Sequence, residues 1–398
     1  MIKKDYKGRI IFHIDMNAFF CSVAEIINPS LRGKAFAIGR ERTTKGVLST
    51  ASYEARKYGI HSAMPIIEAL KKYPKLLVIH IDYKHYEEYH KKFVKLIKEY
   101  TDIIEVASID EVYADMTELS FEKHPIIIAK EIQLRLIREL DLKASIGIGP
   151  TLFLAKMASD MQKPLGLVVL RKRDKVEKLY PLSVSEIYGI GKMTYPKLID
   201  AGIKTIADFD NPNNKNIICN IISDSHYEYI LDCINGKTTN IVDSNRYGDS
   251  QSISSMTTFD IHKTSAIELI YESRSIIRDV YKRLIDGEYL FKSIILTLRD
   301  SSFNTFSRRK TLDEYSSELY IINETIEDLI EEYFDETKSY RLLGVGLSNL
   351  IKQSDYKKEY NLFNIDNNLE KENEIDKLMS SINEKYGKDL INWYKDKK

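Results

Sequence analysis

The order of short apolar and amphipathic segments over the first 170 residues restricts the fold more than any other feature of this chain. Apolar runs of about four to eight residues are typical of buried strands, whereas apolar residues three or four positions apart are typical of helices. Strands are expected at 10–14, 34–39 and 143–149, and two more around a bend within 102–117. Helices are expected at 18–27, 50–59, 85–101, 125–140 and 151–163. This mixed α+β order fits a β-α-β-β-α-β core with one helical insertion after the first strand.

The rest of the chain divides by composition. Residues 173–240 are mostly helical in pattern, and a polar linker follows at 241–252. Residues 253–352 alternate strands and helices again, which predicts a second small α+β domain, and 353–398 form a polar tail. A chain of 398 residues has room for about two to four domains.

Composition argues against several classes of protein. The 59 basic and 59 acidic residues give zero formal charge, so nucleic acid would have to be bound by local basic patches. The three cysteines are not at C-x-x-C spacing, which argues against a zinc site or a disulfide framework and fits a reducing compartment. No apolar stretch resembles a signal peptide or reaches the roughly 18 residues of a transmembrane helix. We therefore expect a cytoplasmic protein, and we expect a monomer.

Three carboxylates stand where the predicted core can bring them together. Asp15 ends the first strand, and Asp110 and Glu111 lie at the bend in SIDEVYAD (108–115). In a regular strand Asp110 and Glu111 would point to opposite faces, so the bend must redirect one of them. Converging carboxylates repel one another unless cations lie between them, and Mg²⁺ or Mn²⁺ suits such ligands. From these residues alone, a hairpin turn explains Asp110 and Glu111 equally well, because Asp is common in turns.

Four blocks of sequence carry a resemblance to a known family. They are HIDMNAFFCSVAEIINPSLRGKAFAIG (13–39), GVLSTASYEARKYGIHSAMP (46–65), SIDEVYAD (108–115) and FLAKMASDMQKPLG (153–166). In this order they resemble the signature blocks of the Y-family, translesion DNA polymerases, and they are most similar to the DinB (DNA polymerase IV) branch. The resemblance implies a multidomain α+β right-hand polymerase with a ferredoxin-like palm (1–18 and 83–172), small fingers (19–82), a helical thumb with a helix-hairpin-helix (173–240), a linker (241–252), an α+β little finger (253–352) and a polar tail (353–398).

The resemblance also implies a catalytic centre for nucleotidyl transfer. The positions that match the family's catalytic, metal-binding carboxylates are Asp15, Asp110 and Glu111, and the backbone carbonyl of Met16 matches a further ligand. Two Mg²⁺ ions, or Mn²⁺ in their place, would serve the attack of a primer 3′-OH on the α-phosphate of a dNTP.

Five further residues match the family's contacts with the dNTP. Phe20 matches a steric gate that leaves no room for a ribose 2′-OH, and the matches to triphosphate contacts are Thr50, Tyr53, Arg56 and Lys163. Without the resemblance, Phe20 would be interpreted as a core residue and Lys163 as an ordinary surface lysine.

Primer–template DNA and a sliding clamp are the expected macromolecular partners. IYGIGKMTYPKL (187–198) resembles a helix-hairpin-helix, in which glycines let backbone N–H groups approach phosphates; the matching residues are Gly189, Gly191 and Lys192. A basic run on a predicted strand of the last domain adds Arg308, Arg309 and Lys310. EYNLF (359–363) loosely resembles clamp-docking peptides, with Leu362 and Phe363 as the apolar contacts.

The chain also departs from the family pattern. Asn17 stands where the family often has Asp, Ala18 is smaller than in some relatives, and DSQSIS (249–254) lacks the basic residues of the corresponding strand. A UmuC-like catalytic subunit that depends on partners, or a catalytically inactive scaffold of a mutagenic repair complex, are the alternatives that remain open. A nucleotidyl cyclase on a similar palm is disfavoured by the YEAR block, the thumb and the little finger.

Overall fold

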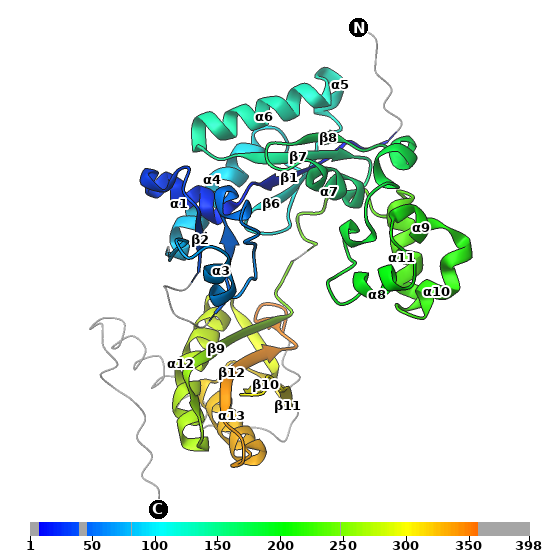
Figure 1. Ribbon diagram of the computed structural model, residues 1–398. Coiled ribbons are helices and arrows are strands. Elements are labelled where there is room, and N and C mark those ends of the chain that lie inside the picture. The colour runs from blue at the N-terminus through cyan, green and yellow to red at the C-terminus, as the bar shows by residue number, and fades with distance from the viewer. Residues whose placement is uncertain (1–7, 40–45, 81, 247, 357–398) are drawn as a thin grey trace, which may run out of the picture. The chain divides into compact units, whose positions relative to one another are not determined.

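A computed structural model describes residues 8–39, 46–80, 82–246 and 248–356 of the chain (Figure 1). It divides into two compact units, one up to Gly248 and the other from Asp249 onward. The first unit contains two sheets and a helical segment, and the second contains one sheet with two long helices. Among the residues described, no helix is long and apolar enough to cross a membrane.

The larger sheet of the first unit has five strands. Their order is β5 (Ile104–Val106), β6 (Glu111–Asp115), β1 (Ile11–Met16), β7 (Ala144–Gly149) and β8 (Leu167–Val169). Strand β1 is central and antiparallel to both β6 and β7. The helices around it are α4 (Tyr83–Lys98), α5 (Leu119–Glu122), α6 (Pro125–Leu140) and α7 (Leu152–Met161). Strands β1, β5, β6 and β7 with α4 and α6 form the predicted β-α-β-β-α-β core in ferredoxin-like order.

The two faces of this sheet differ in character. Phe12 and Ile14 point to one face and pack in the main hydrophobic core with α4 and α6. Because side chains alternate along a strand, His13 and Asp15 point to the other face. Helix α7 covers that second face, on the side of the sheet away from α6 (Figure 1). Polar and charged groups are therefore buried between the sheet and α7.

A small sheet follows the first strand and helix of the chain. Its strands lie in the order β3 (Thr50–Ala51), β2 (Phe36–Ile38) and β4 (Leu77–Ile79), and its helices are α2 (Tyr53–Arg56) and α3 (Ile66–Lys72). Helix α1 (Phe19–Ile27) joins the two sheets, because Phe19 packs in the main core whereas Cys21 and Ala24 pack with β2.

The helix expected at 50–59 is wrong in its bounds. Thr50 and Ala51 pair with β2 as strand β3, so they cannot be helical. The helix begins after Ser52, whose side chain accepts a hydrogen bond from the N–H of Ala55, and it ends at Arg56. Pairing with a neighbouring strand therefore overrides the local helical pattern at this point.

The helical segment of the first unit packs against α7. It contains α8 (Tyr195–Asp200), α9 (Ile206–Asp210), α10 (Lys215–Cys219) and α11 (Asp224–Ile234). Phe153 and Met157 of α7 belong to its hydrophobic core. Helix α7 is thus shared between the large sheet and the helical segment.

The second unit is a sheet covered on one face by helices. The strand order is β11 (Thr305–Ser316), β10 (Tyr289–Asp300), β12 (Tyr340–Ser348) and β9 (Ser252–Lys263), with β13 (Ile351–Lys352) paired to β10. Helices α12 (Ala266–Asp286) and α13 (Leu319–Tyr333) pack on the face that carries Ile294 and Leu296 of β10.

Candidate active site

Asp15 and Glu111 lie opposite each other on the two central strands. In the antiparallel pair of β1 and β6, Asp15 is the register partner of Glu111. Directly opposed residues carry their side chains on the same face of a sheet. That face lies beneath α7, and only 6% of Asp15 is exposed. The fold thus places two carboxylates side by side in a largely buried site.

Asp110 lies in the bend just before β6 and is therefore not bound to the alternation of the strand. Ser108 Oγ donates a hydrogen bond of 2.6 Å to Asp110 Oδ1, and the Met16 N–H donates one of 2.9 Å to the Asp110 carbonyl. No group of three or more His, Cys, Asp or Glu side chains in the described part of the chain is arranged to hold a metal ion. Asp110 completes the predicted carboxylate set only if its side chain turns from Ser108 toward the pair.

Two lysines balance the buried negative charge. Lys156 Nζ of α7 lies 2.6 Å from Glu111 Oε1 and 3.3 Å from Asp15 Oδ2. Lys163 Nζ, in the loop after α7, lies 2.8 Å from the same oxygen of Asp15. Asp160 contacts both ammonium groups, at 3.5 Å from Lys156 and 2.7 Å from Lys163. Sequence reasoning singled out Lys163 but missed Lys156 and Asp160.

The pKa values of these groups show how strongly they interact. Burial, together with a hydrogen bond to Glu111, raises the pKa of Asp15 to about 7, although both lysines oppose the shift. Burial also raises the pKa of Glu111, but the neighbouring His13 and Asp15 side chains and the charge of Lys156 lower it below its usual value overall. Burial lowers the pKa of Lys156, yet the neighbouring carboxylates raise it more, so this ammonium group stays charged.

These observations fit a site for a hard divalent cation. Burial raises the pKa of the Asp15 carboxyl despite the two lysines, and a further cation beside it would favour its charged form. The donors at hand are carboxylate oxygens and the main chain of Met16, which are the ligands that Mg²⁺ and Mn²⁺ prefer.

A hollow of about 240 Å³ opens beside the carboxylate pair. Its lining includes all the residues predicted to hold metal or dNTP: Asp15, Met16, Phe20, Thr50, Tyr53, Arg56, Asp110, Glu111 and Lys163. They come from β1, α1, β3, α2, β6 and the bend before it, and the loop after α7. The structure therefore gathers in one place residues that lie far apart in the sequence, while their individual roles stay predictions.

Polar groups on the wall of α2 suit an anionic ligand. The Tyr53 hydroxyl is buried and has no hydrogen-bond partner among the described residues. The Arg56 guanidinium lies over the Tyr53 ring, 4.9 Å from its centroid, and Arg56 Nε donates a hydrogen bond of 3.0 Å to the Ala51 carbonyl. A buried donor beside a fixed cation can satisfy the acceptor oxygens of a phosphate.

Phe20 forms part of another wall of the hollow. Its ring packs against Tyr86, with 4.3 Å between the ring centroids. Phe19, by contrast, is buried in the main core. Phe20 packs against the edge of that core and also lines the hollow, and its role as a steric gate stays a prediction.

Asn17 and His13 form side-chain contacts that hold other parts of the site in place. Asn17 Nδ2 donates a hydrogen bond of 2.9 Å to Ser145 Oγ, and Asn17 Oδ1 accepts one of 2.8 Å from the Leu165 N–H. Asn17 therefore ties the end of β1 to the loop that carries Lys163, and an aspartate could not supply the amide donor. Sequence reasoning noted Asn17 only as a departure from the family, and it missed the fully buried His13.

The residues predicted to contact DNA lie outside this hollow. Gly189 adopts a φ of 103°, a conformation that favours glycine, and Gly191 and Lys192 are exposed beside it. On β11 the predicted basic run does not share one face. The Arg308 guanidinium lies 4.6 Å from the ring centroid of Tyr333 in α13, and Lys310 Nζ lies 3.3 Å from Asp328 of the same helix. Arg309 is the register partner of Ile295 on β10 and points to the opposite face of the sheet, which no described helix of this unit covers. Leu362 and Phe363, the predicted clamp contacts, lie outside the described residues.

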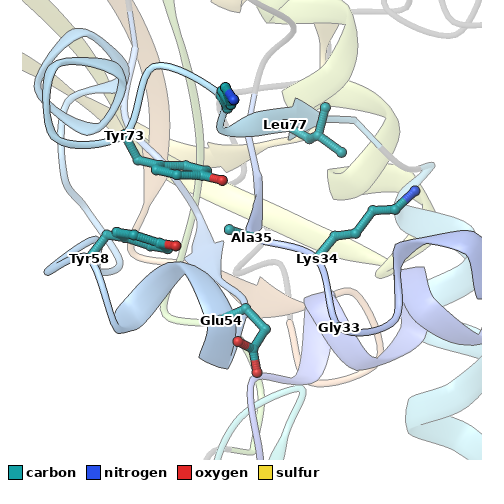
Figure 2. A pocket seen from close by; sticks show the side chains of 8 residues that line it. Gly33, Lys34, Ala35, Glu54, Tyr58, Tyr73 and Leu77 are labelled. Carbon is teal, nitrogen blue, oxygen red and sulfur yellow. The ribbon is translucent and has the colours of Figure 1, made fainter.

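A second, larger hollow of about 480 Å³ lies on the small sheet (Figure 2). Tyr58 and Tyr73 stack on one side of it with 4.2 Å between ring centroids, and Lys34 and Leu77 lie across from them. It contains none of the predicted metal, dNTP or DNA residues. Although this hollow is the larger of the two, it is therefore not the candidate active site.

Comparisons with known proteins identify the family of this chain. Residues 14–160 match the model of the impB/mucB/samB family, and residues 250–360 match that of the C-terminal domain of the same family. The chain is 36% identical to the DNA polymerase IV of Oceanobacillus iheyensis, over 98% of this chain and 93% of that protein. It is 36% identical to the DNA polymerase IV 1 of Bacillus subtilis, over 97% of this chain and 92% of that protein.

Solved structures give the same result. A Y-family DNA polymerase chimera of Dbh and Dpo4 matches with a TM-score of 0.77 at 27% identity, and the match covers 86% of this chain and 99% of that one. An insertion ternary complex of Dbh DNA polymerase matches with a TM-score of 0.59 at 26% identity and the same coverage. The chain therefore belongs to the impB/mucB/samB family, and it is a DNA-directed DNA polymerase of the Y-family, similar to DNA polymerase IV.

Proposed function

We propose that this polymerase performs low-fidelity, template-directed translesion synthesis by transferring a nucleotidyl group from a dNTP to a primer 3′-OH. The main support for the proposal is that one hollow is lined by the carboxylate pair, the aromatic ring of Phe20 and the cations Arg56 and Lys163. These are the three kinds of group needed for the reacting phosphate, the sugar and the rest of the triphosphate. The ternary complex of the related Dbh polymerase supports DNA and nucleotide as the ligands.

Membership of this family implies dependence on a divalent metal, and we propose two Mg²⁺ ions, for which Mn²⁺ can substitute. Asp15, Asp110, Glu111 and the Met16 carbonyl would hold them. When bound, such ions stabilise the charge that develops on the attacking and leaving oxygens.

The remaining residues of the hollow bind and orient the nucleotide. Lys163, Arg56 and the Tyr53 hydroxyl supply donors for the triphosphate oxygens, and Arg56 is held in place by its hydrogen bond to the Ala51 carbonyl. Phe20 lies against the sugar and excludes a 2′-OH. Release of pyrophosphate completes the reaction.

We further propose that the second unit contacts the DNA backbone through the uncovered face of its sheet. That face carries hydroxyls, among them Thr297 and Ser307, whose oxygens lie 2.9 Å apart, and the cations Arg299 and Arg309. Such groups bind phosphates without reading bases. With so few cations on this face and zero net charge overall, we expect weak, salt-sensitive DNA binding and short, distributive synthesis.

Primer extension by purified wild-type protein and two matched variants tests the proposal. Asp110→Asn keeps the size of the side chain and removes its charge, and Asp102→Asn makes the same change at an exposed residue outside the hollow. We expect Asp110→Asn to reduce extension by about a hundredfold or more while primer–template binding is kept. Asp102→Asn should extend primers like the wild type.

Two templates are used, one undamaged and one with a single abasic site. Synthesis past the abasic site by wild type would support the translesion activity, and a stop before it would contradict that part of the proposal. Extension by Asp110→Asn at the wild-type rate would contradict the assigned carboxylate. A wild-type protein that binds primer–template but extends nothing would favour the scaffold or the partner-dependent subunit.

A further inference from the structure

His13 is completely buried on the same face of the sheet as Asp15 and Glu111. Its Nδ1 lies 2.8 Å from Ser159 Oγ of α7. Its Nε2 lies 3.6 Å from Glu111 Oε2 and has no hydrogen-bond partner among the described residues. A buried polar nitrogen without a partner is costly, so its orientation toward a carboxylate calls for an explanation.

The hydrogen of Ser159 decides which ring nitrogen of His13 carries a proton. Ser159 Oγ is placed to donate a hydrogen bond to the Lys156 carbonyl, 2.8 Å away, and it also lies 2.8 Å from His13 Nδ1, but a hydroxyl has a single hydrogen to donate. If that hydrogen lies toward Nδ1, the neutral ring carries its own hydrogen on Nε2, facing Glu111. If the hydroxyl donates to the Lys156 carbonyl instead, Nδ1 carries the ring hydrogen and a lone pair of Nε2 faces Glu111, which the full negative charge of the carboxylate disfavours.

Glu111 is thereby approached from two directions. Lys156 Nζ holds Oε1 at 2.6 Å, and the His13 ring faces Oε2. The gap of 3.6 Å closes to hydrogen-bond distance with a small rotation of the carboxylate. Carboxylates that bind metals are commonly oriented by such outer hydrogen bonds, and losing one costs about 10–100-fold in metal affinity.

We propose that His13 is a positioning residue, whose Nε2–H, fixed by Ser159, orients the Glu111 carboxylate as a metal ligand. This inference rests on the proposed function, because it takes Glu111 to be a metal ligand. His13 itself contacts neither metal nor nucleotide, since Glu111 lies between it and the hollow and His13 is not part of its lining.

The test compares two amides at position 13. In His13→Gln the side-chain NH₂ reaches the place of Nε2, whereas in His13→Asn it reaches only that of Nδ1. Mn²⁺ binding to the full chain is measured by isothermal titration calorimetry without DNA or dNTP. We expect His13→Asn to weaken Mn²⁺ binding about tenfold or more and His13→Gln to stay within about threefold of wild type.

Primer extension provides the second measurement. The Mg²⁺ concentration for half-maximal extension should rise in His13→Asn, while the KM for dNTP stays unchanged because the triphosphate wall is untouched. Thermal unfolding confirms that each variant folds. If His13→Asn fails to fold, Ser159→Ala replaces it, and we expect it to weaken Mn²⁺ binding in the same direction because the ring loses its orienting partner.

Equal Mn²⁺ affinities of His13→Asn and wild type would overturn the proposal. Equal losses of Mn²⁺ affinity in His13→Asn and His13→Gln would also overturn it, because a hydrogen-bond donor at the place of Nε2 would then make no difference. Absence of metal-dependent extension by wild type is a different result. It would contradict the proposed function, while the Mn²⁺ titrations would still decide the role of His13.

Discussion

Phe19 and Phe20 are adjacent in the chain, yet they have different surroundings. Phe19 is 2% exposed in the main core, whereas Phe20 rests on Tyr86 and lines the hollow. Neighbouring residues of a helix point about a quarter-turn apart or more, so one can fill the core while the next meets a ligand. The same change made at these two positions therefore has different consequences.

Replacing Phe20 with alanine should admit ribonucleotides. Loss of the ring removes the group that would collide with a 2′-OH, so we expect the preference for dNTP over rNTP to fall by at least about tenfold, equivalent to ~1.4 kcal/mol. Single-nucleotide insertion with matched dNTP and rNTP measures this ratio. Phe20→Tyr, which keeps the ring, is the control and should retain selectivity. An unchanged ratio in Phe20→Ala would rule out the steric-gate role.

At the scale of elements, the close contact of α7 with β7 positions Lys156 and Ser159. Gly147 of β7 has no room for a side chain, because an added Cβ would lie 2.0 Å from the Ala155 carbonyl oxygen and 2.3 Å from the Ser159 N–H nitrogen. These are backbone atoms of the helix, so the collision cannot be relieved by a side-chain rotation.

Gly147→Ala should therefore push α7 away from the sheet. We expect a loss of stability of about 1–3 kcal/mol or more, as overpacking usually costs. Extension should fall as well, because Lys156 moves away from the carboxylate pair. Urea unfolding and primer extension measure the two effects. Gly191→Ala, where a side chain meets nothing within 4 Å, is the matched control for stability.

Arg309 lies on the uncovered face of the second unit's sheet, whereas its neighbour Arg308 lies on the face covered by helices. Arg309→Ala should weaken primer–template binding and reduce the slope of log affinity against log salt by about 0.9, as expected for one lost phosphate contact. Arg308→Ala should leave this slope nearly unchanged, because its guanidinium packs on the rings of Tyr333 and Phe306. Fluorescence anisotropy at several salt concentrations distinguishes the two. Equal slopes in the two variants would refute the assignment of DNA contact to this face.

Much of the element order could be predicted from the sequence, because local periodicity determines it. The β-α-β-β-α-β core follows from apolar runs and amphipathic spacing. The site was harder to predict. The pairing of Asp15 with Glu111 depends on the register between β1 and β6, and a local pattern does not contain that information.

His13 and Lys156 were missed for a related reason. Both sit within apolar stretches that predict a buried strand and a buried helix, and their importance appears only when β1 and α7 meet. The available signal was chemical: an ionisable side chain in the middle of a buried element needs a partner. Resemblance to a family indicated the groups expected to contact substrate, but His13 and Lys156, which contact the carboxylates, became visible only in the structure.

At the scale of the whole molecule, the two units have separate cores. The second unit buries its own cluster of residues from β9, β10, β12, α12 and α13. Neither the carboxylate pair nor the hollow beside it includes any residue of this unit.

A fragment of residues 249–356 should therefore fold alone. We expect a cooperative thermal transition by circular dichroism and weak DNA binding that falls with salt. The complementary fragment, residues 1–248, should still insert single nucleotides but bind primer–template less tightly than the full chain. A fragment 249–356 that stays unfolded would show that its core depends on the rest of the chain.

The two-faced sheet also limits how this family can vary in length. Along β1 and β6, residues that fill the main core alternate with residues on the face of the Asp15–Glu111 pair. Deleting or inserting one residue within either strand would turn valines and isoleucines toward the nucleotide and carboxylates into the core. We therefore expect insertions and deletions only in the connections between elements, where the length can change without moving the carboxylate pair.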